Sequence, residues 1–378
     1  MITLNNPSDC SGCTACASVC SHNAITMKPD ALGFLYPIVD KKKCVDCGIC
    51  ETKCPFNEHY DTSLNFDAPI VYGARHKKID EVMRSRSGAV FVAISDFILD
   101  SGGVVYGVCY THLFKIAHKR ATNKAERDEF RGSKYVQSDL TGIFRNIRDD
   151  LTAGLTVLFA GTGCQVAGLK SFIGTKLGNN LFLVDIVCHG VVSPYIWRDY
   201  ISYLESRRQK RIVSFNFRDK TTFGWSAHRE TYKFEGEDKT TVSNYHLYNK
   251  IYFRKSCSSC HFCNTRRTGD VTLADFWGWQ KQGVTLKDDD KGLNLVLINT
   301  PKGEMLFKTV MNDLIAFKVN DDSYLQPNLK HPTPIHPFRD QMEMDYIKKS
   351  FEYVFFHDYD SPSLVDRVRR YIGKIWQR

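Results

Sequence analysis

Residues 10–20 read CSGCTACASVC, and residues 44–54 read CVDCGICETKC, so one cysteine spacing, C-x2-C-x2-C-x3-C, occurs twice. In such a run three thiolates on one tight loop face a single 4Fe–4S cluster, and the fourth cysteine ligates the cluster of the other run. The spacing therefore predicts two clusters. Their expected ligands are Cys10, Cys13, Cys16 and Cys54 for the first, and Cys44, Cys47, Cys50 and Cys20 for the second. A domain of this kind handles electrons.

Disulfides and zinc are the alternatives to this interpretation. A disulfide scaffold suits a short secreted chain, but Met1–Asp9 is polar and lacks the basic start and apolar stretch of a signal peptide. Structural zinc sites usually combine two separated C-x2-C pairs instead of this run. Fourteen cysteines without a secretion signal therefore indicate a reducing cytoplasm, where thiols persist as metal ligands.

The composition is that of an ordinary globular protein. The 378 residues are 43% hydrophobic and 25% charged, and the length suggests two or three domains. Apolar runs such as residues 90–99 and 181–188 are shorter than the roughly 18 residues that a transmembrane helix needs. The net charge of +9 is spread along the chain without a nucleic-acid-binding module. We therefore expect neither a membrane span nor a nucleic-acid partner.

Hydrophobic periodicity predicts an α/β fold after the cysteine-rich start. The expected units are a two-cluster ferredoxin-like domain at 1–62, a domain at 70–152, a domain with a strand-rich part at 153–325, and a helical tail at 326–378. Within them we expect helices at 87–101, 139–151 (with Asp139 as N-cap), 164–172 and 194–207, and strands at 104–109, 155–160 and 181–187. Strand–helix–strand–helix at this length implies a right-handed parallel unit.

A third group of cysteines falls in this α/β part. Cys164 and Cys188 each follow an expected parallel strand, at the sheet edge where α/β folds hold ligands. Cys257, Cys260 and Cys263 follow farther along the chain. A C-x2-C pair and two loop cysteines supply four thiolates, enough for another 4Fe–4S cluster. The alternative is a zinc knuckle built from the three later cysteines and His261 or a distant histidine.

Short stretches around these residues resemble the coenzyme F-420 hydrogenase/dehydrogenase beta-subunit family, here with an N-terminal dicluster ferredoxin domain fused ahead. The matching stretches are Ser87–Gly88, Gly132–Ser138, Gly161–Lys170, Cys188–Pro194, Phe217–Lys220, Cys257–Cys260 and Asp270–Gly278. The resemblance implies a flavoprotein that holds FAD beside a 4Fe–4S cluster and passes electrons between iron–sulfur donors and a soluble acceptor.

The resemblance also implies site residues. It makes Cys164, Cys188, Cys257 and Cys260 the ligands of the third cluster and leaves Cys263 as a spare thiol or an alternative ligand. The residues that it brings close to FAD are Ser87, Gly88, Gly132, Ser133, Lys134 and Tyr135. No G-x-G-x-x-G motif follows a strand, and by composition alone Lys134 reads as a surface lysine. His189 either serves the cluster by hydrogen bonding or proton transfer or fixes its turn.

These observations predict an iron–sulfur flavoprotein oxidoreductase that relays single electrons to a flavin, which exchanges two with a small organic substrate. Relatives with this architecture accompany surface-polysaccharide assembly, which allows a sugar or sugar-nucleotide substrate. A ferredoxin or similar protein is the expected redox partner. The alternatives are a non-catalytic electron-transfer subunit and a zinc-stabilised binding module. Residues 363–378 have helical spacing and either pack on their own domain or dock on a partner or a membrane surface.

Overall fold

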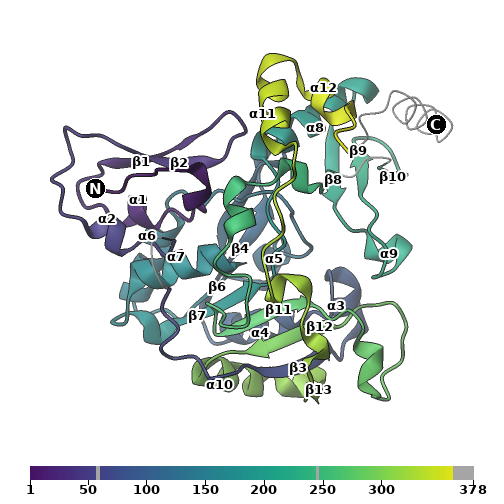
Figure 1. Ribbon diagram of the computed structural model, residues 1–378. Coiled ribbons are helices and arrows are strands. Elements are labelled where there is room, and N and C mark those ends of the chain that lie inside the picture. Colours follow the sequence, from purple (N-terminus) through teal and green to yellow (C-terminus); the bar gives the residue numbers. More distant parts are fainter. Residues whose placement is uncertain (57–59, 244–246, 361–378) are drawn as a thin grey trace.

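The computed structural model describes residues 1–56, 60–243 and 247–360, which form a cysteine-rich head set on an α/β body (Figure 1). The helix expected at residues 363–378 lies outside the described residues. Among the described helices, none combines the length and the apolar character needed to cross a bilayer.

The head consists of a two-stranded antiparallel sheet and two short helices. Its elements are α1 (Ala15–Val19), β1 (Ile25–Pro29), β2 (Leu35–Val39) and α2 (Ile49–Thr52). Both cysteine loops contain left-handed residues at equivalent positions: Gly12 and Thr14 in the first, Asp46 and Gly48 in the second. A left-handed residue between successive cysteines bends the chain sharply, which lets each short loop curl around one centre.

The body is built on one eight-stranded sheet in the order β13-β3-β12-β11-β7-β6-β4-β5. The strands are β3 (Ile70–His76), β4 (Val104–Tyr110), β5 (Ile116–Ala121), β6 (Val157–Thr162), β7 (Leu181–Ile186), β11 (Val271–Asp275), β12 (Asn294–Ile298) and β13 (Leu314–Val319). The central strands β4, β6, β7 and β11 are parallel, and the strands outside them pair antiparallel. The sheet is therefore mixed, with parallel strands in the middle and antiparallel strands outside them. It contains strands from both sides of residue 152, where the sequence suggests a domain boundary.

Helices cover both faces of the sheet. One face packs against α4 (Val90–Asp100) and α10 (Pro301–Val310), and the other against α6 (Ile143–Thr152) and α7 (Gly163–Ile173). The head rests on the second face, because α1 contacts both α6 and α7. The remaining short helices of the body are α3 (Ile79–Arg84) and α5 (Lys124–Asp128).

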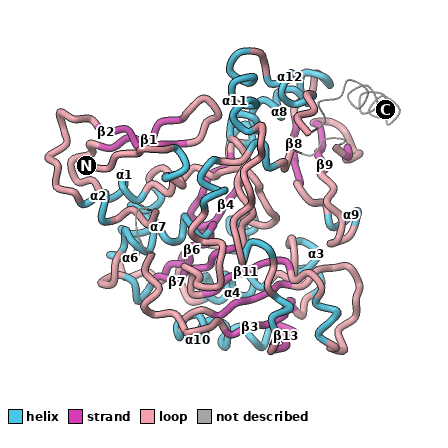
Figure 2. The backbone as a smooth tube through the Cα atoms, viewed as in Figure 1, coloured by secondary structure: helices cyan, strands magenta, loops and turns pink. Residues whose placement is uncertain are grey.

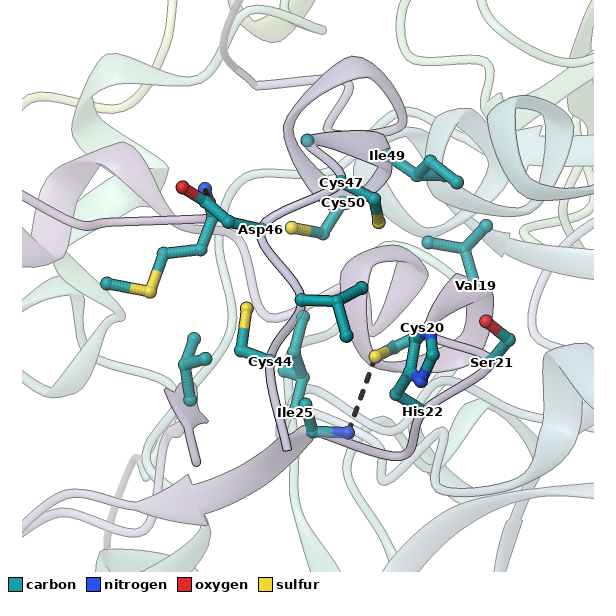
Figure 3. A pocket seen from close by; sticks show the side chains of 15 residues that line it. Val19, Cys20, Ser21, His22, Ile25, Cys44, Asp46, Cys47, Ile49 and Cys50 are labelled. Atoms are coloured by element: carbon teal, nitrogen blue, oxygen red, sulfur yellow. Dashed lines mark hydrogen bonds and ion pairs between the residues drawn. The ribbon is translucent and has the colours of Figure 1, made fainter. Parts of the chain in front are cut away.

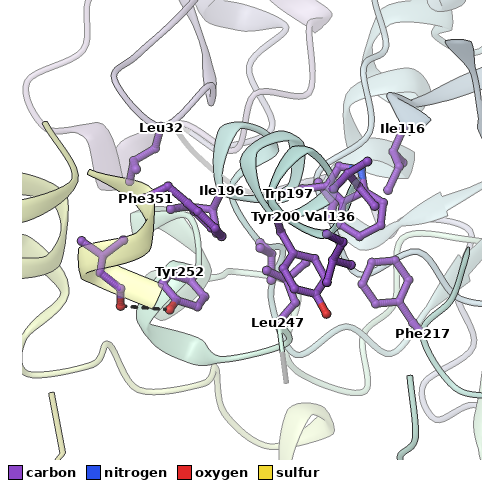
Figure 4. Close-up of a cluster of buried hydrophobic side chains, with 14 of the residues drawn as sticks. Leu32, Ile116, Val136, Ile196, Trp197, Tyr200, Phe217, Leu247, Tyr252 and Phe351 are labelled. Carbon is purple, nitrogen blue, oxygen red and sulfur yellow. Dashed lines mark hydrogen bonds between the residues drawn. The ribbon is translucent and has the colours of Figure 1, made fainter. Parts of the chain in front are cut away.

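A second unit packs above the sheet and has its own core. It contains a three-stranded sheet that Figure 2 shows apart from the main one. Its elements are α8 (Pro194–Arg208), β8 (Ile212–Asn216), α9 (Lys220–Phe223), β9 (Thr231–Phe234), β10 (Thr241–Val242), α11 (Arg339–Lys348) and α12 (Phe351–Phe356). Leu32, at the tip of the head hairpin, enters this core beside Ile196 and Trp197 (Figure 4). The Ser193 hydroxyl donates a hydrogen bond to the Leu32 carbonyl at 2.6 Å. The head is therefore attached to the body at two places.

The expected order of strands and helices from residue 155 to residue 207 is confirmed as β6, α7, β7 and α8. The expected N-cap of α6 is wrong. The helix begins at Ile143, after the left-handed Gly142. The Asp139 carboxylate instead accepts from the Thr141 amide at 2.8 Å and pairs with Lys115 at 2.6 Å. The Asp139 carboxylate is therefore used by a local turn and by an ion pair with Lys115, and it does not cap the helix.

Candidate metal centres and cofactor site

The second cysteine run encloses a cavity of about 440 Å³, which is partly open to solvent. All four ligands expected for the second cluster, Cys20, Cys44, Cys47 and Cys50, line it. Figure 3 shows these four side chains arranged around a shared space, with Val19 and Ile25 beside them. The backbone amides of Ala24 and Ile2 donate to the sulfurs of Cys20 and Cys50, at 3.3 and 3.2 Å. Such bonds stabilise thiolates that ligate a metal.

The ligands expected for the first cluster also come together. Burial raises the pKa of Cys13 well above its usual value, and the neighbouring thiols of Cys16, Cys54 and Cys10 raise it further. Burial likewise raises the pKa of Cys16 to about 12, and Cys50 of the other run contributes to that shift. The two groups of cysteines are therefore adjacent: Cys54 lies near the first group, and Cys20 lines the cavity of the second. Which cluster each of these two cysteines ligates stays a prediction.

A larger cavity, of about 590 Å³, lies at the carboxyl edge of the parallel strands. Cys164, Cys188, Cys257, Cys260 and Cys263 all line it. Cys164 is in the first turn of α7, immediately after β6, and Cys188 comes two residues after β7. The loop of residues 255–263 closes the cavity from the other side. Ser11, which belongs to the first cysteine run of the head, lines it as well, so the first and third thiol groups are neighbours.

The thiols around this cavity favour the protonated form when no metal is present. Burial raises the pKa of Cys257 to about 12 and raises that of Cys188 further, with neighbouring thiols adding to both shifts. Burial also raises the pKa of Cys164. The Thr162 hydroxyl at 3.2 Å and the charge of Arg254 lower this pKa, but by less than burial raises it. A metal deprotonates coordinating thiols outright. A crowded set of four or five thiols, of which Cys263 is buried and the others are partly buried, therefore fits an iron–sulfur cluster.

Cys263 and Cys260 form a hydrogen-bonded pair. That bond lowers the pKa of Cys263 to about 7 and raises the pKa of Cys260.

The zinc alternative needs a nitrogen ligand, for which His261 is a candidate. The His261 ring is exposed and stacks on Phe56 at 4.3 Å between ring centroids. No three His, Cys, Asp or Glu side chains within residues 1–56, 60–243 and 247–360 converge as the ligands of a single ion would. Each ligand of one zinc ion lies about 2.0–2.3 Å from it, whereas a cubane spreads its ligands around a wider space.

The residues expected near FAD lie in two places. Ser87 and Gly88 precede α4, where the Ser87 hydroxyl donates to the Leu293 carbonyl at 2.7 Å. Gly132 has a left-handed backbone and open space around it, and Ser133 is half-buried. The Tyr135 ring packs against Phe217 and Tyr248, at 5.6 and 4.3 Å.

Lys134 differs from the expectation. Its amine donates to the carbonyls of Glu129 and Arg131 at 2.9 and 2.8 Å, and burial lowers its pKa to about 7. Lys134 is therefore not a solvated surface lysine. That it lies close to FAD stays a prediction.

Two largely buried arginines, which were not among the expected site residues, lie between Ser87–Gly88 and Tyr135. Arg86 adjoins Ser87, and Arg218 approaches the Tyr135 hydroxyl at 3.5 Å. Both guanidinium groups approach one carboxylate, that of Asp275, at 3.7 and 2.9 Å. Arg86 Nε and Nη1 and Arg218 Nε have no hydrogen-bond partner among the described residues. Buried N–H groups rarely lack an acceptor, and guanidinium groups bind phosphates and carboxylates well, so an anionic cofactor or substrate fits here.

Histidine and tryptophan side chains complete this arginine cluster. His228 Nε2 lies 3.2 Å from Arg218, and the half-exposed Trp277 ring stacks on Trp225 at 4.4 Å. His189 lines the third cavity, and Asp275 and Arg218 both influence its pKa, which burial lowers. His189 therefore lies between the third thiol group and the arginines. One signal was available in the sequence, since Arg218 lies in the matching stretch Phe217–Lys220, but its spacing indicates no role.

Comparisons with known proteins give matches to two family models and to a solved structure. Residues 9–57 match the 4Fe–4S dicluster domain, and residues 154–322 match the family described as the C-terminal part of the beta subunit of coenzyme F420 hydrogenase/dehydrogenase. No curated protein matches. Among solved structures, a chain of the xenon-derivatised F420-reducing NiFe hydrogenase complex from Methanosarcina barkeri is similar, with 14% identity and a TM-score of 0.46. That alignment covers 70% of this chain and 90% of the other.

The two family matches cover the two parts of the molecule in which the cysteines gather. The first spans both cysteine runs of the head, and the second includes Cys164, Cys188, Cys257 and Cys260. The chain therefore combines an N-terminal 4Fe–4S dicluster domain with a region that matches the C-terminal part of the coenzyme F420 hydrogenase/dehydrogenase beta subunit, and it is an iron–sulfur electron-transfer protein related to that subunit.

Proposed function

We propose that this protein is an iron–sulfur flavoprotein oxidoreductase. In this proposal the head exchanges single electrons with a ferredoxin-like partner through two clusters. A third cluster at Cys164, Cys188, Cys257 and Cys260 receives these electrons. The observation that carries the proposal is the third cavity, where those four thiols lie beside Ser11 of the head and His189 of the body. A relay across the junction needs such neighbouring sites.

The arginine cluster supports a flavin next to the third cavity. Bound FAD would supply a group that accepts electrons one at a time and delivers two, which organic reductions require. Arg86 and Arg218 would hold an anionic group through their unpartnered N–H bonds. His189, whose pKa is lowered by burial, would be the residue that holds or passes a proton at the cavity wall. An anionic organic substrate such as a sugar nucleotide would suit the same charges.

The Lys134 hydrogen bonds favour a second candidate, a non-catalytic electron-transfer subunit. Two backbone carbonyls accept from the Lys134 amine, which leaves at most one further N–H donor for a flavin diphosphate or ring. In this alternative the clusters are present, the flavin is absent, and a partner protein carries out the organic chemistry.

Cofactor analysis of the anaerobically purified, reconstituted protein separates the two candidates. The oxidoreductase predicts about one flavin per chain, with an absorption band that bleaches on addition of dithionite or a reduced ferredoxin. Three clusters with no flavin would overturn the flavoenzyme and support the subunit. Zinc without acid-labile sulfide would overturn both.

A further inference from the structure

Arg254 occupies the junction between the head and the body. Its guanidinium donates three hydrogen bonds to oxygen atoms from different parts of the chain. Nε bonds to the Cys10 carbonyl at 2.8 Å, Nη2 to the Leu35 carbonyl at 3.0 Å, and Nη1 to the Gln137 side chain at 2.8 Å. The Tyr36 ring lies under the guanidinium at 4.2 Å. Every one of these partners is uncharged.

Arg254 differs in this respect from the other fully buried arginines. Arg127, Arg267 and Arg339 are, like Arg254, only 2% exposed. Each of those three has a carboxylate within 3.0 Å, and the partners are Asp96 for Arg127, Asp185 for Arg267 and Glu343 for Arg339. No carboxylate among the described residues lies within ion-pair distance of Arg254. A buried charge without a countercharge is costly, and native proteins pair such charges or place them beside metal centres.

The Asp30 carboxylate lies beyond ion-pair distance of Arg254, although the charge of Arg254 still acts on it. The anions that share a cavity with Arg254 are the thiolates of the third site. Arg254 lines the third cavity together with Cys164 and Cys257. A 4Fe–4S cluster with four thiolate ligands carries a net negative charge, and that charge increases when the cluster accepts an electron.

We propose that Arg254 is the countercharge of the third cluster and stabilises its reduced state, which draws electrons from the head into the body. The inference rests on the third cluster of the proposed function. One electron moves from the first cluster to the third, and no bond is formed or broken. Because the added electron is attracted to the fixed guanidinium, the third cluster has a higher reduction potential than it would have without Arg254.

The same contacts make Arg254 a positioning residue for the electron path. The Gln137 side chain accepts from Arg254 and donates to the Ser11 carbonyl at 2.9 Å. Both residues thereby hold the loop of the first cysteine run against the third cavity. A Cβ on Gly12 would meet Arg254 Nη1 and Gln137 Nε2, each at 2.9 Å, so this loop has no room for a larger residue.

An EPR-monitored redox titration of the holoprotein tests the proposal. The signal of the third cluster is the component that is absent from Cys188→Ala. In Arg254→Gln we expect reduction of this cluster to be at least about tenfold less favourable, which corresponds to 59 mV for one electron. Arg254→Lys keeps the charge and should restore most of the wild-type potential. Gln137→Glu, which keeps Arg254 but neutralises it, should shift the potential in the same direction as Arg254→Gln.

Iron content separates failure of this inference from failure of the proposed function. About twelve irons per wild-type chain establish that the third cluster is present; about eight would remove the proposed function on which the inference rests. With the third cluster present, an unchanged potential in Arg254→Gln, or an equal drop in Arg254→Lys, would overturn the electrostatic role. Should Arg254→Gln not assemble the cluster, Gln137→Glu decides: a lowered potential supports the role, and an unchanged one overturns it.

Discussion

The head and the body assemble their thiol sites in different ways. In the head, eight cysteines within residues 10–54 surround two adjacent sites, and almost every geometric requirement is met inside one short stretch. In the body, three loops separated by up to about a hundred residues converge at the edge of a sheet that is already packed on both faces. Local spacing thus encodes the first kind of site, whereas the second depends on the fold.

The two regions also differ in what stabilises them. Apart from its cysteines, the apolar cluster around the second site is small: Ile2 and Ile25 are buried in it, and Ala17, Val19 and Val39 pack against it partly buried. The body has extensive buried cores on both faces of its sheet. A small domain with few apolar contacts depends on bound metal for its folding free energy. The head should therefore depend on its clusters and the body should not.

Removing the clusters should produce the largest effect and the clearest contrast between the regions. We expect anaerobic chelation of iron to unfold residues 10–54, because neutral thiols cannot replace the metal bonds, while β6 and β7 remain protected. Hydrogen exchange followed by mass spectrometry measures both regions in one experiment. Head amides that stay as protected as those of β6 would show that the head folds without metal.

Within the body, the neighbouring thiols Cys260 and Cys263 should behave differently. We expect Cys260→Ala to lose about four irons per chain, since a cubane needs four ligands, and Cys263→Ala to lose none. Both thiols are in the same loop and line the same cavity, so each variant is a control for the other. Iron loss in Cys263→Ala with full iron in Cys260→Ala would reverse their roles.

The contact between the two regions should respond to one added methyl group. Gly168 lies in α7, and a Cβ there would come within 2.8 Å of both Cβ and Sγ of Cys13. Overpacking of this kind costs about 1–3 kcal/mol, so Gly168→Ala should lower the denaturant midpoint of the holoprotein. Gly178→Ala is the matched control, because no atom lies within 4 Å of its added Cβ. Equal midpoints for the two variants would mean that the head is not tightly packed against α7.

The remaining prediction concerns the pH dependence of stability and is confined to the body. Burial lowers the pKa of His118 to about 4, and the ring lies between Ser138 Oγ and the Ala160 carbonyl, each at 3.1 Å. An unfolded histidine has a pKa of about 6.5. Between these values the unfolded state binds more protons, so stability is complete above about pH 6.5 and falls as the pH drops towards 4.

The loss reaches at most about 3 kcal/mol near pH 4. Urea unfolding followed by tryptophan fluorescence reports this loss for the body, since all five tryptophans lie after residue 196. His118→Gln should flatten the pH dependence between pH 7 and 5. A variant with the wild-type slope would assign the effect to another group.

The head and the body also differ in how much of their thiol sites could be predicted from the sequence. The crossed ligand sets of the head follow from spacing alone, and the positions of Cys164 and Cys188 follow from the strand–helix alternation. The number of thiolates suggests that the loop containing Cys257 joins them, but the zinc alternative stays open and only the resemblance selects Cys257 and Cys260 as ligands, because sequence distance does not show which loops meet. Arg218 and Arg254 gain their significance from burial and from missing partners, and a single sequence shows neither.

The presence of the third cluster can be measured as the iron and acid-labile sulfide content of the anaerobically purified protein and of Cys188→Ala. Three clusters predict about twelve irons and twelve sulfides per wild-type chain, and about eight of each in the variant, with the head unaffected. Equal iron in the two proteins would contradict the account, because the third thiol group would then hold no cluster and the relay would end in the head.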